Sequence, residues 1–198
     1  DGADTILTGS SPVANIAAGA NGAEIEDVKF LGVGAPTATA SAIRTDATTT
    51  GVKLTNIEVT NFSSYAIAIH NNGVINGWVL DGVNASGNQH GMRVRGAASN
   101  LTITNSNFDD NVSHGFFVVV GGGTMDGLAI TDSTFNGNGD KGLYFERGTN
   151  LEFHNIEVKD TGGDGTHTSP HAIEFNLKEG ATAGPVSSAV RRVHGSRW

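Results

Sequence analysis

A short segment of constant pattern recurs along the chain, and this repeat limits the possible folds more than any other feature. The copies begin at residues 23, 52, 78, 101, 128 and 151, which are 23 to 29 residues apart. Two of the clearest read Leu101-Thr-Ile-Thr-Asn105-Ser-Asn-Phe108 and Leu128-Ala-Ile-Thr-Asp132-Ser-Thr-Phe135. One such unit is too short to bury its own apolar face, so the repeat indicates a solenoid whose units stack on one another.

Each repeat also carries a second apolar pair at alternating positions. Alternation with a period of two residues predicts short strands with one face turned inward. The pairs are Ile67/Ile69, Met92/Val94, Phe116/Val118, Leu143/Phe145 and Ile173/Phe175, with Ile43 in the first repeat. A small residue usually precedes this second strand: Ala66, Gly91, Gly115, Gly142 and Ala172.

These patterns predict an all-β fold, a single-stranded right-handed parallel β-helix of about six coils. We expect one domain over residues 1–198, with regular coils over 23–180. Residues 1–22 are expected to form an irregular first coil or cap, and residues 181–198 an irregular C-terminal tail. A β-sandwich is the alternative, because it also has short alternating strands. The match of residue types between repeats, with Leu101 between Trp78 and Leu128, favours the solenoid.

One polar position recurs in almost every repeat, where we expect a corner of the coil. It holds Asp27, Asn56, Asn105, Asp132 and Asn155, with Gly82 as the exception. Asparagine tolerates a left-handed backbone, and its side chain can bond to the adjacent coil. We therefore interpret these residues as structural.

The net charge of −8 argues against nucleic acid as a partner, because phosphates require a concentrated basic face. The chain has no cysteine, which excludes a disulfide framework and a thiolate metal site. It has no apolar run long enough to span a membrane and no signal peptide, and it begins at Asp1 as a trimmed product would. We expect a secreted or cell-surface protein.

The register predicts which residues point outward from the second strand. One row reads Arg44, Ala68, Arg93, Phe117, Tyr144 and Glu174, and the next reads Asp46, His70, Arg95, Val119, Glu146 and Asn176. Just before the strand, a third row holds Tyr65, His90, His114 and Lys141. A groove along a rigid solenoid suits a polymer, because each coil offers one rung of contacts.

These rows suggest an acidic polysaccharide as the partner. Exposed Phe117 and Tyr144 would stack on sugar rings, while Arg93 and Arg95 would pair with carboxylates. The remaining residues of the predicted substrate-binding set are Glu146, His90, His114 and Lys141. In the simpler alternative, the aromatic row only strengthens stacking between coils, and the charges are solvated.

The stretch Ser64-Tyr65-Ala66-Ile67-Ala68-Ile69-His70, followed by Gly91-Met92-Arg93-Val94 and Gly115-Phe116, resembles the catalytic β-helix module of mannuronan C5-epimerases. It is similar, more broadly, to carbohydrate-active β-helix proteins that include polysaccharide lyases. The epimerase family carries the motif Tyr-Gly-(aromatic or aliphatic)-Asp-Pro-His. Tyr65 and His70 match its tyrosine and histidine, whereas Ala68 and Ile69 stand where the motif has aspartate and proline. The resemblance implies lyase or C5-epimerase activity on a uronate polysaccharide.

Such a reaction removes a proton α to a carboxylate, which requires a group that neutralises the carboxylate, a base and an acid. Under this resemblance, Arg95 or Arg93 would neutralise the carboxylate. His70, with an ordinary pKa suited to a base, would accept the proton, and Tyr65 would donate one. The predicted catalytic set is thus His70, Arg95 and Tyr65. A non-catalytic β-helix, serving as an adhesin, a surface-layer element or a sugar-binding module, is the alternative.

A second arrangement would suit glycoside hydrolysis. Tyr144 and Glu146 are two residues apart and share one face, and Glu146 with Glu174 would form a carboxylate pair one coil apart. A surface ion pair between Lys141 and Glu146 is the simpler interpretation.

Two segments raise the question of a bound metal, either calcium or zinc, and only calcium is kept as a candidate cofactor. Gly2-Ala3-Asp4 matches half of a calcium-binding nonapeptide. In the loop 160–171, Asp160 and Asp164 could bind calcium, and His167 with His171 could bind zinc. A polar turn accounts for each segment more simply, so no metal ligand is predicted.

Overall fold

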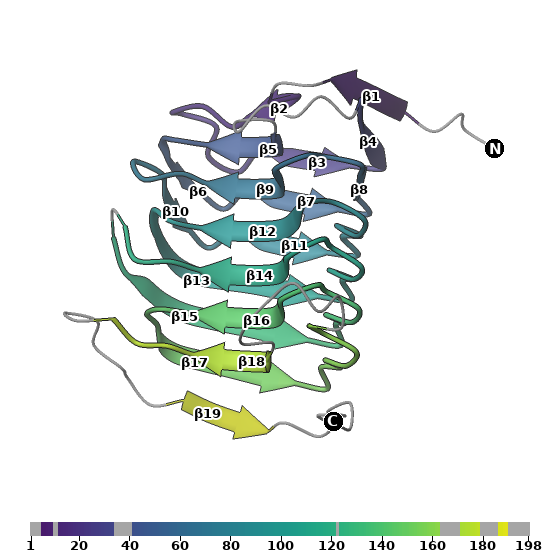
Figure 1. Ribbon diagram of the computed structural model, residues 1–198. Helices are drawn as coiled ribbons and strands as arrows, with labels where there is room; N and C mark the ends of the chain where they lie inside the picture. Colours follow the sequence, from purple (N-terminus) through teal and green to yellow (C-terminus); the bar gives the residue numbers. More distant parts are fainter. Residues whose placement is uncertain are drawn as a thin grey trace.

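The chain winds into a right-handed parallel β-helix, as the repeat predicts (Figure 1). The computed structural model describes residues 5–9, 12–33, 41–121, 123–162, 171–178 and 186–189. These residues contain no helix, and every strand pair among them is parallel. Each coil contributes to three sheets in the same order, here named A, B and C.

Sheet A is the least regular of the three. It contains β1 (Thr5–Gly9), β4 (Val28–Gly32) and β8 (Glu58–Thr60). In later coils it is reduced to single bridges that join Glu58, Asn84, Asn107, Thr134 and Glu157 in succession.

Sheets B and C contain the two strands that the repeat predicts. Sheet B runs in the order β2 (Ala14–Asn15), β5 (Ser41–Thr45), β9 (Tyr65–Ile69), β12 (His90–Val94), β14 (His114–Val118), β16 (Lys141–Phe145) and β18 (His171–Phe175). Sheet C runs in the order β3 (Glu24–Glu26), β7 (Lys53–Thr55), β11 (Val79–Asp81), β13 (Ala97–Thr104), β15 (Met125–Thr131), β17 (Thr149–His154) and β19 (Val186–Ala189). Two short strands, β6 (Thr48–Thr50) and β10 (Val74–Asn76), precede β7 and β11.

The two ends extend these sheets. Within residues 1–22, β1 pairs with β4 and β2 pairs with β5, so this region begins the first coil. In the C-terminal tail, β19 pairs with β17, and the rest of residues 181–198 lies outside the described part of the chain.

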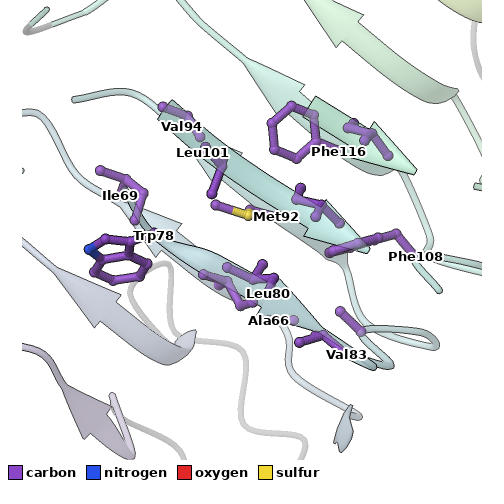
Figure 2. Packing of buried hydrophobic residues seen from close by; sticks show 14 of the residues in the cluster. Ala66, Ile69, Trp78, Leu80, Val83, Met92, Val94, Leu101, Phe108 and Phe116 are labelled. Atoms are coloured by element: carbon purple, nitrogen blue, oxygen red, sulfur yellow. The ribbon is translucent and has the colours of Figure 1, made fainter. Parts of the chain in front are cut away.

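The interior is filled by columns of equivalent apolar residues. Leu101, Leu128 and Leu151 lie opposite one another in adjacent strands and are buried. A second column is fully buried and contains Phe30, Val59, Ala85, Phe108, Phe135 and Val158. Figure 2 shows Phe108 within this packing, together with Trp78 and Leu101 of the first column. Removing these side chains from water supplies the main driving force for stacking the coils.

The polar corner residues adopt the left-handed backbone that the sequence predicts. Asp27, Asn56, Asn105, Asp132 and Asn155 have φ between 49° and 53°, and Gly82 has φ 65°. The side chain of Asn56 also donates to Asp27 Oδ1 of the preceding coil at 3.2 Å. Their role is therefore structural.

A buried asparagine ladder precedes sheet B and sets where its strands begin. Asn88, Asn111 and Asn138 are at most 1% exposed. The backbone N–H of Asn88 donates to Asn111 Oδ1, and that of Asn111 to Asn138 Oδ1, both at 3.0 Å. Because each asparagine lies two or three residues before a strand of sheet B, the ladder aligns His90, His114 and Lys141 on successive coils.

Candidate functional site

The outer face of sheet B brings the predicted site residues together in the predicted register. The paired positions are Arg44, Ala68, Arg93, Phe117, Tyr144 and Glu174, in that order. The row before it pairs Tyr65 with His90 and His114 with Lys141. The last row lies just after the strands. Backbone hydrogen bonds between adjacent coils align its members in the order His70, Arg95, Val119, Glu146 and Asn176.

An aromatic cluster occupies the centre of this face. It consists of Tyr65, His90, His114, Phe117 and Tyr144, whose contacting rings have centroids 4.7 to 5.9 Å apart. Phe117 is only 7% exposed, so the expectation that its ring is open to sugar is wrong. The rings of Tyr65, His90 and His114 cover the Phe117 ring, although Phe117 belongs to the outward-facing row.

Arg93 is held against Tyr65. Its Nη1 donates to the Tyr65 hydroxyl at 2.6 Å, and its Cζ lies 4.0 Å from the centre of the Tyr65 ring. Arg93 lies on β12 and Tyr65 on the neighbouring strand β9. Ala68 of β9 pairs with Arg93 in the outer row and is fully buried. A small side chain at position 68 leaves room for the arginine to lie along the sheet. Arg93 Nε is buried and has no hydrogen-bond partner.

Arg93 belongs to a group of residues that we name the arginine cluster: Arg44, His70, Arg93, Arg95 and Asp46. Asp46 is its one carboxylate; it accepts from Arg44 Nε at 2.8 Å and lies 3.9 Å from His70 Nδ1. A hollow of about 550 Å³ opens beside Arg44 and Asp46, with Asn15 and Ile16 on its other wall.

His70 lies within the arginine cluster as a neutral side chain. Burial lowers the pKa of His70, and the positive charges of Arg44 and Arg93 lower it further, against the opposing effect of Asp46. The imidazole is therefore able to accept a proton at neutral pH. Its Nε2 is buried without a hydrogen-bond partner.

The three predicted catalytic residues are not in mutual contact. Tyr65 begins β9 and His70 directly follows it, so roughly 16 Å of extended strand separates their Cα atoms. Arg93 connects them, because it bonds to Tyr65 and its charge acts on His70. Arg95 is exposed, and its carbonyl accepts from the buried Arg147 at 2.8 Å.

The other half of the face carries what we name the acidic end: Asp140, Lys141, Glu146, Glu174 and Lys178. The prediction that Lys141 pairs with Glu146 is wrong. Lys141 Nζ instead lies 2.7 Å from Asp140 Oδ1 and 3.5 Å from Glu174 Oε2. Glu146 accepts from the Tyr144 hydroxyl at 2.9 Å and from the Val120 N–H at 2.7 Å, and Lys178 is 3.6 Å away. Burial and Glu146 raise the pKa of Tyr144 to about 12, so this phenol keeps its proton.

The two histidines of the aromatic cluster are held by different contacts. His114 Nε2 lies 3.2 Å from Asp140 Oδ2, and its Nδ1 lies 2.7 Å from Ser113 Oγ. Burial, with the charges of His114 and Arg93, lowers the pKa of His90 to about 3. The sequence analysis missed Ser113 and Asp140, although each directly precedes a predicted site residue.

Within the described ranges, no group of three or more histidine, aspartate or glutamate side chains could hold a metal ion. Residues 2–4, Asp164 and His167, considered above for metal binding, lie outside those ranges. The same part of the chain contains no helix long and apolar enough to cross a membrane.

A family model described as a right handed beta helix region matches residues 15–179. The chain matches no curated protein. Among solved structures, it is similar to the A-module of the Azotobacter vinelandii mannuronan C-5 epimerase AlgE4, with 11% identity and a TM-score of 0.35. That match covers 98% of this chain and 71% of the other, and it is too distant to support a functional argument.

Proposed function

We propose, since this chain belongs to the family of right-handed β-helices, that it acts on an acidic polysaccharide through the outer face of sheet B. The reaction is lyase or C5-epimerase chemistry on a uronate. The observation that carries this proposal is the arginine cluster, in which the charges of three arginines from two coils act on His70 and Asp46 is the single carboxylate.

The cluster contrasts with the molecule as a whole, whose net charge is −8. A partly buried guanidinium is costly unless an anion pairs with it. Arg93 is partly buried and its Nη1 donates to the Tyr65 hydroxyl, so no carboxylate of the described residues is shown to balance its positive charge. A uronate carboxylate would supply that charge, and arginine matches its planar geometry.

The proposed chemistry gives a role to each of the predicted side chains. Arg93, with Arg95, neutralises the carboxylate, which makes the proton on C5 more acidic. Neutral His70 accepts that proton through its imidazole ring. In a lyase, the oxygen on C4 then leaves with the proton of the Tyr65 hydroxyl, and a C4–C5 double bond forms. In an epimerase, a proton instead returns to C5 on the opposite face.

Turnover of a panel of polyuronates tests this proposal. Unsaturated products would be followed by ultraviolet absorbance, and epimer content by NMR. We expect His70→Gln to lower kcat by about 100-fold or more while the polymer still binds. Arg93→Gln should weaken binding, and the control Lys53→Gln on the outer face of sheet C should change neither. If no polyuronate is converted, the catalytic proposal is wrong.

Non-catalytic binding of the same polymers is the second candidate. It is favoured by Ala68, which stands where the epimerase motif has an aspartate, and by the engagement of the Tyr65 hydroxyl with Arg93. A glycan array separates the two candidates. Binding that depends on Arg93, without any conversion of the sugar, would support a sugar-binding module.

A further inference from the structure

The charges on the outer face of sheet B are divided along the axis of the helix. The arginine cluster lies on β5, β9 and β12 or directly after them, with three arginines and one carboxylate. The acidic end lies around β16 and β18, with three carboxylates and two lysines. A long anionic polymer on this face would therefore meet attraction at one end and repulsion at the other.

The last row of the face shows the change most directly. Arg95 and Glu146 occupy equivalent positions two coils apart, which corresponds to about 10 Å along the axis. Between them lies Val119, which carries no charge. The change of sign thus occurs over the length of about two sugar rings, because a pyranose ring is nearly as long as the coil spacing of about 4.8 Å.

The carboxylates of the acidic end are only partly screened by water. The side chains of Asp140, Glu146 and Glu174 are 11%, 16% and 21% exposed. Lys178, the lysine next to Glu146, is more exposed at 44%. Lys141, which is 11% exposed, pairs with both Asp140 and Glu174, so the acidic end keeps one net negative charge. Because charges near a low-dielectric surface interact more strongly than in water, this charge would repel a sugar carboxylate placed here.

This arrangement restricts the polymers that fit, on the premise of the proposed function. A homopolyuronate lying along the axis places a carboxylate on every coil, including those of Glu146 and Glu174. We infer that the preferred ligand is a heteropolysaccharide with isolated uronates, each followed by at least three uncharged sugars. Its uronate binds at the arginine cluster, and its uncharged sugars lie on Tyr144 and Asn176. The carboxylates of the acidic end select against other polymers by repulsion.

Binding of two polymers, each long enough to cover the whole face, tests the inference. One probe is deacylated gellan, which has a single glucuronate in each four-sugar repeat, and the other is polygalacturonate. At low salt we expect gellan fragments to bind about fivefold to tenfold more tightly than polygalacturonate fragments of equal length. Equal affinities, or a preference for polygalacturonate, would overturn the inference.

Two variants identify the source of the preference. The double variant Glu146→Gln with Glu174→Gln should narrow the ratio of affinities to about twofold, mainly by improving the binding of polygalacturonate. The double variant Glu26→Gln with Glu152→Gln, on the outer face of sheet C, removes two carboxylates from elsewhere and should leave the ratio unchanged. A ratio that responds equally to both changes would show that only overall charge matters, against the inference. If neither polymer binds, the proposed function fails first, and the inference with it.

Discussion

At the scale of single residues, His90 shows how a side chain on the outer face can behave like one in the core. Its ring stacks on Tyr65 at 5.0 Å and contacts Phe117 at the same distance. Its Nδ1 is buried without a partner, and its pKa is lowered to about 3, mainly by burial. His90 is therefore neutral at physiological pH and is not a cation that binds carboxylates.

The pKa of His90 predicts how stability responds to acid. The unfolded chain protonates this histidine near its ordinary pKa of about 6.5, whereas the folded chain does not until about pH 3. Between these values the unfolded state binds the extra proton, so stability falls as the pH falls, by up to about 1.4 kcal/mol per pH unit. His90→Phe keeps a ring in the stack but cannot titrate.

We therefore expect the free energy of unfolding of His90→Phe to depend less steeply on pH than that of the wild type. Urea denaturation between about pH 7 and pH 4 measures both slopes. The carboxylates titrate equally in the two proteins, so the difference isolates the histidine. Equal slopes would mean that His90 is protonated in the folded state.

Phe117 and Arg147 mark the limit of prediction at this scale. Alternation predicted Phe117 correctly in the outer row. Its burial, however, depends on His114 of its own strand and on His90 and Tyr65 from the two preceding coils. Arg147 has no counterpart in the repeat, and its Nη2 reaches two coils away to the carbonyls of Arg95 and Gly96. A contact made by one coil alone leaves no periodic signal in a sequence.

At the scale of strands, the small residue near the start of each sheet B strand has a steric cause. A Cβ added to Gly115 would lie 2.7 Å from the carbonyl oxygen of Gly142 and 2.8 Å from that of Phe108. It would also lie 2.9 Å from Asn138 Nδ2 of the buried ladder. Backbone and a fully buried amide surround the site, so no neighbour can move aside easily.

Gly115→Ala should therefore destabilise the protein by about 1–3 kcal/mol, as overpacking of a filled interior does. Ala66→Gly, at the equivalent position on β9, is the matched control; we expect it to cost about 1 kcal/mol or less, because it removes a methyl group without creating a clash. Chemical denaturation of both variants checks the prediction. A Gly115→Ala protein as stable as the wild type would show that the coils can separate locally.

The strands themselves were predictable to different degrees. The strands of sheets B and C could be predicted, because in every coil each of these strands has apolar residues at alternate positions. Sheet A was not foreseen as a separate sheet, since after β8 it consists of single bridges at Asn84, Asn107, Thr134 and Glu157. β2 contains only Ala14 and Asn15, which is too short to show alternation.

At the scale of the whole molecule, the strands of each coil pair only with those of the coils before and after it. The column on the inner face of sheet C runs in register through Ile25, Leu54, Leu80, Ile103, Ile130 and Phe153. The spacing of the repeats predicts this column, because equivalent residues must stack when every unit has the same shape. Stability should then depend on whether a coil has neighbours on both sides.

Ile25 and Ile103 test this dependence with the same residue type in the same column. Ile103 is fully buried between Leu80 and Ile130, whereas Ile25, on β3, is only partly buried and has Leu54 on one side. Ile103→Ala leaves a cavity with packed walls and should cost about 3–4 kcal/mol, while Ile25→Ala should cost about 1 kcal/mol. Urea denaturation gives both values. Equal losses would mean that the first coil is packed as tightly as the central ones, and that stability is not set coil by coil.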